Sequence, residues 1–104
     1  MIIVATALPG VMRIVAEPHQ DTRGLFARLY CPEEFAAAGI EFTPSQVNLS
    51  TNRARGTLRG LHFQKPPQAE AKLVRVIRGA AWDVAVDLRP GPTFGQWIAE
   101  ELTA

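Results

Sequence analysis

Short apolar stretches alternate with turn residues along the whole chain. Proline and glycine recur at close intervals, as in Pro9-Gly10, Pro66-Pro67 and Pro90-Gly91-Pro92. Several short strands separated by such turns are typical of a β-sandwich or barrel. The segments with the apolar content of strands are 2–6, 12–17, 24–30, 46–51, 57–64, 72–78, 81–87 and 96–102. The pattern therefore predicts a single all-β domain over residues 1–104.

One stretch, CPEEFAAAG at residues 31–39, favours a helix instead. Pro32 suits the first helical position, because its missing N–H would have no partner there. Glu33 and Glu34 place negative charge at the positive end of the helix dipole, and Gly39 suits the stop. We expect one short helix in an otherwise β-structured chain.

Two of the expected strands carry polar residues on one face, because successive side chains of a strand point to opposite sides. In QVNLST, Gln46 and Asn48 share a face, and in WDVAVDLR the aspartates Asp83 and Asp87 lie opposite Trp82. A surface sheet with its polar side in water explains this pattern. A barrel whose interior is a polar ligand cavity is the alternative. The pattern alone favours the surface sheet and leaves the barrel open.

The stretch GTLRGLHFQ at residues 56–64 bears on that choice. Strict alternation places Arg59 and His62 on opposite faces of a strand. Gly60 lies between them and is the residue most suited to a bulge or a close backbone approach. A bulge at Gly60 would bring both side chains to a common face, which we state as a hypothesis.

Charge and composition restrict the class of partner. The chain has 11 basic and 10 acidic side chains and a net charge of +1, which argues against nucleic acid as an obligate partner. The one cysteine, Cys31, cannot form an intrachain disulfide, and no apolar run approaches the length of a membrane helix. We therefore expect a cytoplasmic protein that binds neither membrane nor nucleic acid.

Candidate chemistry narrows to one histidine. His19 and His62 lie far apart, and Gln64 stands where a second ligand of a His-x-His pair would be, so we predict no metal and no cofactor. His62 can act as a general base near neutral pH. Lys72, at the start of a later strand, could stabilise an enolate formed by proton abstraction beside a carbonyl. From residue types alone this signal is weak.

The motifs LRGLHFQ, AKLVRV and DVAVDLRPGPTFGQW, in this order and preceded by DTRGLFARLYCPEEFAAAGI, resemble the dTDP-4-dehydrorhamnose 3,5-epimerase family of nucleotide-sugar epimerases. The resemblance covers nearly the whole chain. It implies a cupin-type jelly roll (double-stranded β-helix) with an active site inside the barrel, no metal, and a homodimer. It also implies epimerisation of a 4-keto-6-deoxy nucleotide-sugar at carbon 3, carbon 5 or both.

The resemblance assigns roles to particular residues. His62 is similar to the family's general base, Lys72 to the lysine near the 4-keto oxygen, and Asp83 to a supporting aspartate inside the barrel. The residues that match positions holding the nucleotide-sugar are Arg23, Gln46, Asn48 and Arg59.

Two departures from the family pattern qualify these expectations. Arg28 stands where many members have a glutamate that contacts substrate, and it is a candidate phosphate ligand instead. The chain stops at Ala104, so we expect the N-terminal portion of the jelly roll, a C-terminally truncated member without the family's tyrosine proton donor. Two alternatives follow: a non-catalytic module that binds sugar nucleotides on the same scaffold, and a plain structural β-domain.

Overall fold

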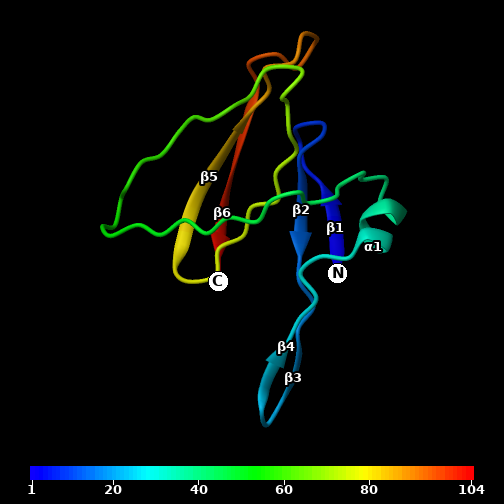
Figure 1. The fold of residues 1–104 in the computed structure, drawn as a ribbon, viewed down its shortest axis with the longest axis vertical. Helices are drawn as coiled ribbons and strands as arrows, with labels where there is room; N and C mark the ends of the chain where they lie inside the picture. Colours follow the sequence, from blue (N-terminus) through cyan, green and yellow to red (C-terminus); the bar gives the residue numbers. More distant parts are fainter.

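The structure is a computed structural model that describes residues 1–104. Its regular structure consists of three antiparallel two-stranded sheets and one short helix (Figure 1). The elements are β1 (Ile2–Ala5), β2 (Met12–Val15), β3 (His19–Asp21), β4 (Gly24–Phe26), α1 (Pro32–Ala37), β5 (Ala80–Val86) and β6 (Trp97–Thr103). The prediction of a mostly β-structured chain with one helix is confirmed.

The turn of the β1–β2 hairpin is held by the side chain of Thr6 and contains a buried leucine. Thr6 Oγ1 donates to Val11 O at 2.7 Å and also accepts from the backbone N–H of Leu8 at 3.2 Å. Leu8 is 2% exposed, so the turn itself forms part of the small core. Local turn chemistry therefore makes this hairpin, as the Pro9-Gly10 signal predicts.

The helix α1 begins and ends where the sequence predicts. Cys31 is its N-cap residue, Pro32 opens it, and Gly39 follows it with φ +74. The helix buries Phe35, whose ring packs against Tyr30 at 5.1 Å and Phe42 at 5.9 Å between ring centroids. This aromatic cluster attaches the helix to the chain on either side of it.

A polar cluster at the end of β5 joins two hairpins that lie far apart in sequence. Asp87 is 5% exposed and accepts hydrogen bonds from Arg89 Nε at 2.9 Å and Thr93 Oγ1 at 2.7 Å. Arg89 Nη2 also donates to Pro9 O at 2.6 Å, in the turn of β1–β2. We call Asp87, Arg89 and Thr93 the Asp87 cluster. It ties the β5–β6 hairpin to the N-terminal hairpin.

Residues 43–75 form no strand and no helix, and each of them is exposed. We call residues 43–75 the open segment. The only backbone–backbone hydrogen bond within it runs from Gln68 N to Lys65 O at 2.9 Å. In Figure 1 this green part of the chain runs out past β5 and returns.

The strands predicted at 46–51, 57–64 and 72–78 are therefore wrong for this structure. A strand is defined by a ladder to a neighbour, and nothing in the 104 residues pairs with these segments. The strand predicted at 24–30 is also shorter, ending at Phe26, and β3 was not predicted. The remaining predicted strands, at the N-terminus and after Ala80, are present within one or two residues at most ends.

The chain as a whole is loosely closed. Only Leu8, Phe35 and Asp87 are buried, and the backbone forms 29 hydrogen bonds where a globular domain of this length forms roughly 70. The radius of gyration is 15.3 Å, against about 13 Å for a compact domain of this length. No helix of the structure has both the length and the apolar character that crossing a bilayer requires.

Candidate functional site

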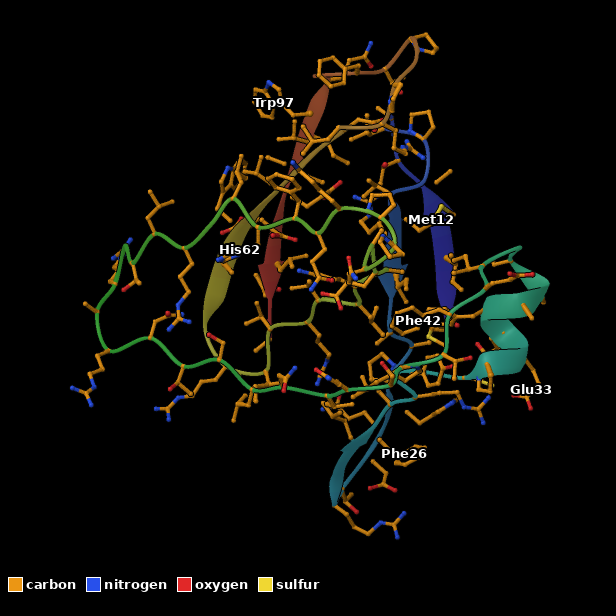
Figure 2. The ribbon with its side chains drawn as sticks, turned by 45° about the horizontal axis from the view of Figure 1, so that its top comes forward. Met12, Phe26, Glu33, Phe42, His62 and Trp97 are labelled. Carbon is orange, nitrogen blue, oxygen red and sulfur yellow. The ribbon has the colours of Figure 1, made fainter.

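His62, the predicted general base, lies on the open segment with its side chain exposed (Figure 2). No hydrogen bond or ion pair engages its imidazole. Gly60, two residues before it, has φ +103, a backbone conformation that side chains with a Cβ rarely adopt. A Cβ at position 60 would lie 3.3 Å from His62 Nδ1. A bulge needs a strand ladder, which residues 57–64 lack, so the predicted bulge and the common face of Arg59 and His62 stay predictions.

Arg59 is held by neutral partners. Its Nε donates to Asn52 Oδ1 at 2.8 Å, and its Nη2 donates to Thr51 O at 3.2 Å. A guanidinium has five N–H donors, so most of those of Arg59 remain available. Because an amide and a carbonyl carry no charge, the positive charge of Arg59 is not neutralised by its partners.

Arg23 and Arg28 differ from Arg59 because each is paired with a carboxylate. Arg23 Nη2 lies 2.6 Å from Asp21 Oδ2 across the β3–β4 turn, and this hydrogen bond raises the pKa of Arg23 and lowers that of Asp21. Arg28 Nη1 lies 2.6 Å from Glu34 Oε1, which raises the pKa of Arg28 and lowers that of Glu34. Both arginines would have to share or leave a carboxylate to bind an anion.

Arg28 also lines a cavity of about 270 Å³ at the base of the β3–β4 hairpin. The remaining lining residues are Met1, Glu17, His19, Phe26 and Glu34. The cavity therefore contains both signs of charge together with an aromatic ring. Of the predicted site residues, it includes Arg28 alone.

The other predicted residues form no hydrogen bond or ion pair with one another. Lys72 Nζ is 3.4 Å from Glu70 Oε1, and Asp83 is exposed on β5. Gln46 and Asn48 lie on the open segment, exposed and without hydrogen bonds from their side chains. No hydrogen bond or ion pair joins any two of the eight predicted residues. Five of them lie on the open segment, Arg23 and Arg28 lie in and just after the β3–β4 hairpin, and Asp83 lies on β5.

The structure shows no group of three or more His, Cys, Asp and Glu side chains arranged to hold a metal ion. A second cavity, of about 430 Å³, lies where β1–β2 meets β6 and includes Arg13 and Glu100, whose charged atoms are 3.7 Å apart. None of the predicted site residues lines it.

The Asp87 cluster is the group of polar residues that the sequence reading missed. Asp87 was placed by parity on the polar face with Asp83, yet only Asp87 is buried. Arg89 donates to both Asp87 oxygens, and these bonds with that of Thr93 hold the pKa of the Asp87 carboxyl far below its ordinary value. The available signal was an aspartate and an arginine two residues apart at the start of a Pro-Gly turn, where side chains bond to the nearby backbone.

The chain matches known proteins over most of its length. The sequence profile of the dTDP-4-dehydrorhamnose 3,5-epimerase family matches residues 5–104. A protein of that name from Salmonella typhimurium is 42% identical over 106 residues, which cover 100% of this chain and 57% of the relative. A dTDP-4-dehydrorhamnose 3-epimerase from Streptomyces niveus is 45% identical over 97 residues, covering 91% of this chain and 46% of the relative.

A solved structure has the same backbone arrangement. The crystal structure of dTDP-4-dehydrorhamnose 3,5-epimerase from Bacillus anthracis with TDP and PPi bound superposes with a TM-score of 0.92 at 37% sequence identity. The superposition covers 97% of this chain and 58% of that chain. This chain therefore spans about half the length of the relatives that it matches.

Proposed function

The chain belongs to the dTDP-4-dehydrorhamnose 3,5-epimerase family, and from this premise we propose that it carries the base-bearing part of an epimerase for a 4-keto-6-deoxy nucleotide-sugar. The observation that carries the proposal is the family match over residues 5–104, within which the predicted base and its predicted cationic neighbours all lie. The isomerase activity is that of the whole relative, and this chain spans 57% of the Salmonella protein. For this chain the activity is therefore part of the proposal.

The proposed chemistry is proton abstraction beside a ketone. The hydrogens on carbons 3 and 5 are acidic because both carbons flank the 4-keto group. His62 removes one of them, and Lys72 stabilises the enolate oxygen that forms. Return of a proton to the opposite face inverts the centre. Relatives named as 3,5-epimerase and as 3-epimerase both match this chain, so we propose inversion at carbon 3, carbon 5 or both.

The substrate's phosphates would be bound by arginines. We assign the leading role to Arg59, because its partners are neutral and its charge is available. Arg23 and Arg28 are secondary ligands, because each already pairs with a carboxylate. Gln46 and Asn48 would bond to the sugar or the nucleotide, and Asp83 would support the base.

The finer features of the fold belong to the same proposal. We propose that the three hairpins are parts of a cupin-type jelly roll, and that the protein acts as a cytoplasmic homodimer without a metal or organic cofactor. The structural match at a TM-score of 0.92 supports the jelly roll through the neighbour's epimerase identity.

Solvent deuterium exchange tests the proposed chemistry. The protein is incubated with dTDP-4-keto-6-deoxyglucose in D₂O, and incorporation at carbons 3 and 5 is followed by NMR against a protein-free control. His62→Ala should slow the exchange by roughly 100-fold or more. His19→Ala is the matched control, since His19 is the only other histidine, and it should exchange like the parent. Equal exchange by the parent and His62→Ala would refute the assignment of the base.

A second candidate function is a non-catalytic module that binds sugar nucleotides. The observation in its favour is that no hydrogen bond or ion pair joins any two of the eight predicted residues, and the 270 Å³ cavity includes only Arg28 among them. This function predicts binding of the nucleotide-sugar, weakened by Arg59→Gln, with no deuterium exchange by the parent protein. Calorimetry alongside the exchange assay distinguishes the two functions.

A further inference from the structure

The open segment carries most of the positive charge of the chain. It includes six lysines and arginines but only one acidic residue, Glu70, whereas the rest of the chain has five basic and nine acidic side chains. The segment therefore has a formal charge of +5 and the remainder −4, although the net charge of the whole chain is +1. A charge asymmetry of this kind indicates that the basic part meets an anionic ligand.

The arginines of the two parts also differ in their partners. Outside the open segment, four of the five arginines form an ion pair with a carboxylate. Within the segment, Lys72 pairs with Glu70, and none of the arginines forms an ion pair. These arginines are Arg53, Arg55, Arg59 and Arg75, and all four are exposed. The positive charge of the segment is therefore concentrated on guanidinium groups that no carboxylate neutralises.

Three of these arginines belong to one turn, residues 51–59, which we call the arginine turn. Arg59 Nε donates to Asn52 Oδ1 at 2.8 Å, and Arg59 Nη2 donates to Thr51 O at 3.2 Å. The guanidinium group of Arg59 therefore folds back against the residues that come immediately before Arg53. The side chain that we assign to the substrate's phosphates thus lies beside a second arginine of the same turn.

A further hydrogen bond closes the tip of the arginine turn. Thr57 Oγ1 donates to Ala54 O at 2.7 Å. Gly56, just before Thr57, has φ +78, which favours glycine and lets the chain reverse. Ala54 separates Arg53 from Arg55, so the bond holds the backbone between the two arginines. Both arginines are therefore carried by a turn that bonds to itself at three places.

The short chain between these residues keeps their charges within electrostatic range. Because each residue advances the chain by at most ~3.6 Å, the Cα atom of Arg55 lies within about 11 Å of that of Asn52, which binds Arg59. Charges in water act over roughly 30 Å at 10 mM salt and ~8 Å at physiological ionic strength. An anion that approaches Arg59 therefore also meets the potential of Arg53 and Arg55.

We propose that Arg53 and Arg55 steer the diphosphate of the substrate toward Arg59. They raise the rate of association through their charge and form no contact with the bound ligand. Steering suits them because electrostatic attraction increases the rate of encounter more than the final affinity. This proposal rests on the proposed binding of a nucleotide-sugar, and it adds two residues that none of the site assignments includes.

The test measures association and dissociation rates separately. Thymidine diphosphate that carries a fluorophore on its sugar is mixed with the protein by stopped flow. The double variant Arg53→Gln/Arg55→Gln should associate roughly threefold to fivefold more slowly than the parent at about 10 mM salt. Its dissociation rate should change less than about twofold, and at about 1 M salt its association rate should equal that of the parent, because charges are then screened within ~3 Å.

Two further double variants separate charge from contact and from net charge. Arg53→Lys/Arg55→Lys retains both charges but removes the planar guanidinium groups, so it should associate and dissociate like the parent. Arg13→Gln/Arg78→Gln removes the same net charge outside the arginine turn and should slow association less than about twofold at 10 mM salt. Because Arg53 and Arg55 are exposed and unpaired, circular dichroism of their variants should match that of the parent.

Three results would overturn the proposal. The first is an unchanged association rate in Arg53→Gln/Arg55→Gln, or no binding of the diphosphate by the parent. The second is faster dissociation in the glutamine or lysine variant, since the two arginines would then contact the ligand. The third is an equal loss in Arg13→Gln/Arg78→Gln, which would make net charge the cause.

Failure of this proposal is distinguishable from failure of the proposed function. A protein that binds the diphosphate with the expected salt dependence but incorporates no deuterium into the substrate would refute the epimerase activity and retain the steering. A protein that incorporates deuterium at a rate dependent on His62, but associates at a rate independent of Arg53 and Arg55, would refute the steering alone.

Discussion

The β5–β6 hairpin and the open segment differ in how far their backbone N–H and C=O groups are hydrogen-bonded. The hairpin pairs seven residues on each strand and is anchored at its turn by the Asp87 cluster. The open segment also carries exposed apolar side chains, such as Val47 and Leu58, but it has one backbone hydrogen bond. Both regions belong to the family match, and most of the predicted site residues lie on the open segment, the region with fewer backbone hydrogen bonds. The hairpin is specified by contacts between residues near in sequence, whereas almost no backbone contact within the chain fixes the open segment.

Hydrogen exchange should show the largest difference between the two regions. In the protein alone, amides in the centre of β5 and β6, such as Val84 and Ala99, should exchange roughly 100-fold more slowly than amides of the open segment. The reason is that exchange from the hairpin requires breaking its ladder, whereas the open segment has almost no bonds to break. Mass spectrometry of peptic peptides measures both regions in one sample. Equal exchange would show that the hairpin is not an independent unit of stability.

Removing the buried charge should weaken the hairpin without affecting the open segment. Asp87→Asn retains the shape but removes the carboxylate that three hydrogen bonds from Arg89 and one from Thr93 satisfy. The melting midpoint should fall by several degrees, because a buried hydrogen-bonded charge pair is broken. Trp82 and Trp97 lie on β5 and β6, so tryptophan fluorescence reports this hairpin alone. Asp83→Asn, at an exposed position on β5, is the control and should melt like the parent.

The pH dependence of the hairpin follows from the same carboxyl group. The pKa of Asp87 is lower in the folded chain than its ordinary value of 3.8, chiefly because Arg89 donates hydrogen bonds to it. Its contribution to stability is therefore fully present above about pH 4 and is lost as the pH falls further, when the unfolded chain takes up the proton first. Fluorescence melts between pH 6 and pH 2 should show this loss in the parent and a weaker one in Asp87→Asn. Identical profiles would exclude the carboxylate as the cause.

The sequence predicts the parts of the fold that local chemistry determines. The turn at Pro9-Gly10 and the helix at Pro32 follow from residues within a few positions of each other. The strands expected at 46–51, 57–64 and 72–78 were wrong because apolar alternation shows that a segment can pair, not that a partner is present. The arginine pairs were not predictable either. Nothing in the pattern shows that Arg28 meets Glu34 while Arg59 meets Asn52.

A substitution at Gly60 should change the position of the His62 imidazole without changing the stability of the β5–β6 hairpin. Gly60→Ala forces a residue with a Cβ into φ +103 and brings that Cβ within 3.3 Å of His62 Nδ1. The positive φ should strain the new alanine by ~1–2 kcal/mol. Because no ladder holds the segment in place, the backbone should shift locally to relieve this strain, and the imidazole of His62 should move with it. The NMR resonances of His62 should change, and incorporation of solvent deuterium into the substrate should slow several-fold. The melting midpoint followed by tryptophan fluorescence should stay unchanged.

Gly56→Ala provides the matched control for that comparison. Gly56 also has a positive φ of +78 and lies on the same segment, but a Cβ there meets nothing within 4 Å. It should carry a similar local strain without touching His62, so its histidine resonances and exchange rate should resemble those of the parent. A similar loss in both variants would show that the segment's backbone, and not contact with His62, sets the activity.

Two arginines differ in the charge of their partners, and substituting each should weaken binding to a different extent. Arg59→Gln should weaken binding of the nucleotide-sugar by about tenfold, because the charge of Arg59 is not matched by a carboxylate and charge-assisted bonds to phosphate are strong. Arg28→Gln should weaken it only about twofold to threefold, since Glu34 already offsets that charge and exposed pairs contribute little. Calorimetry at two salt concentrations measures both, and the loss at Arg59 should shrink more at high salt. The reverse order would mean that Arg28 leaves Glu34 for the phosphate, and that the β3–β4 hairpin, rather than the open segment, binds the charged part of the substrate.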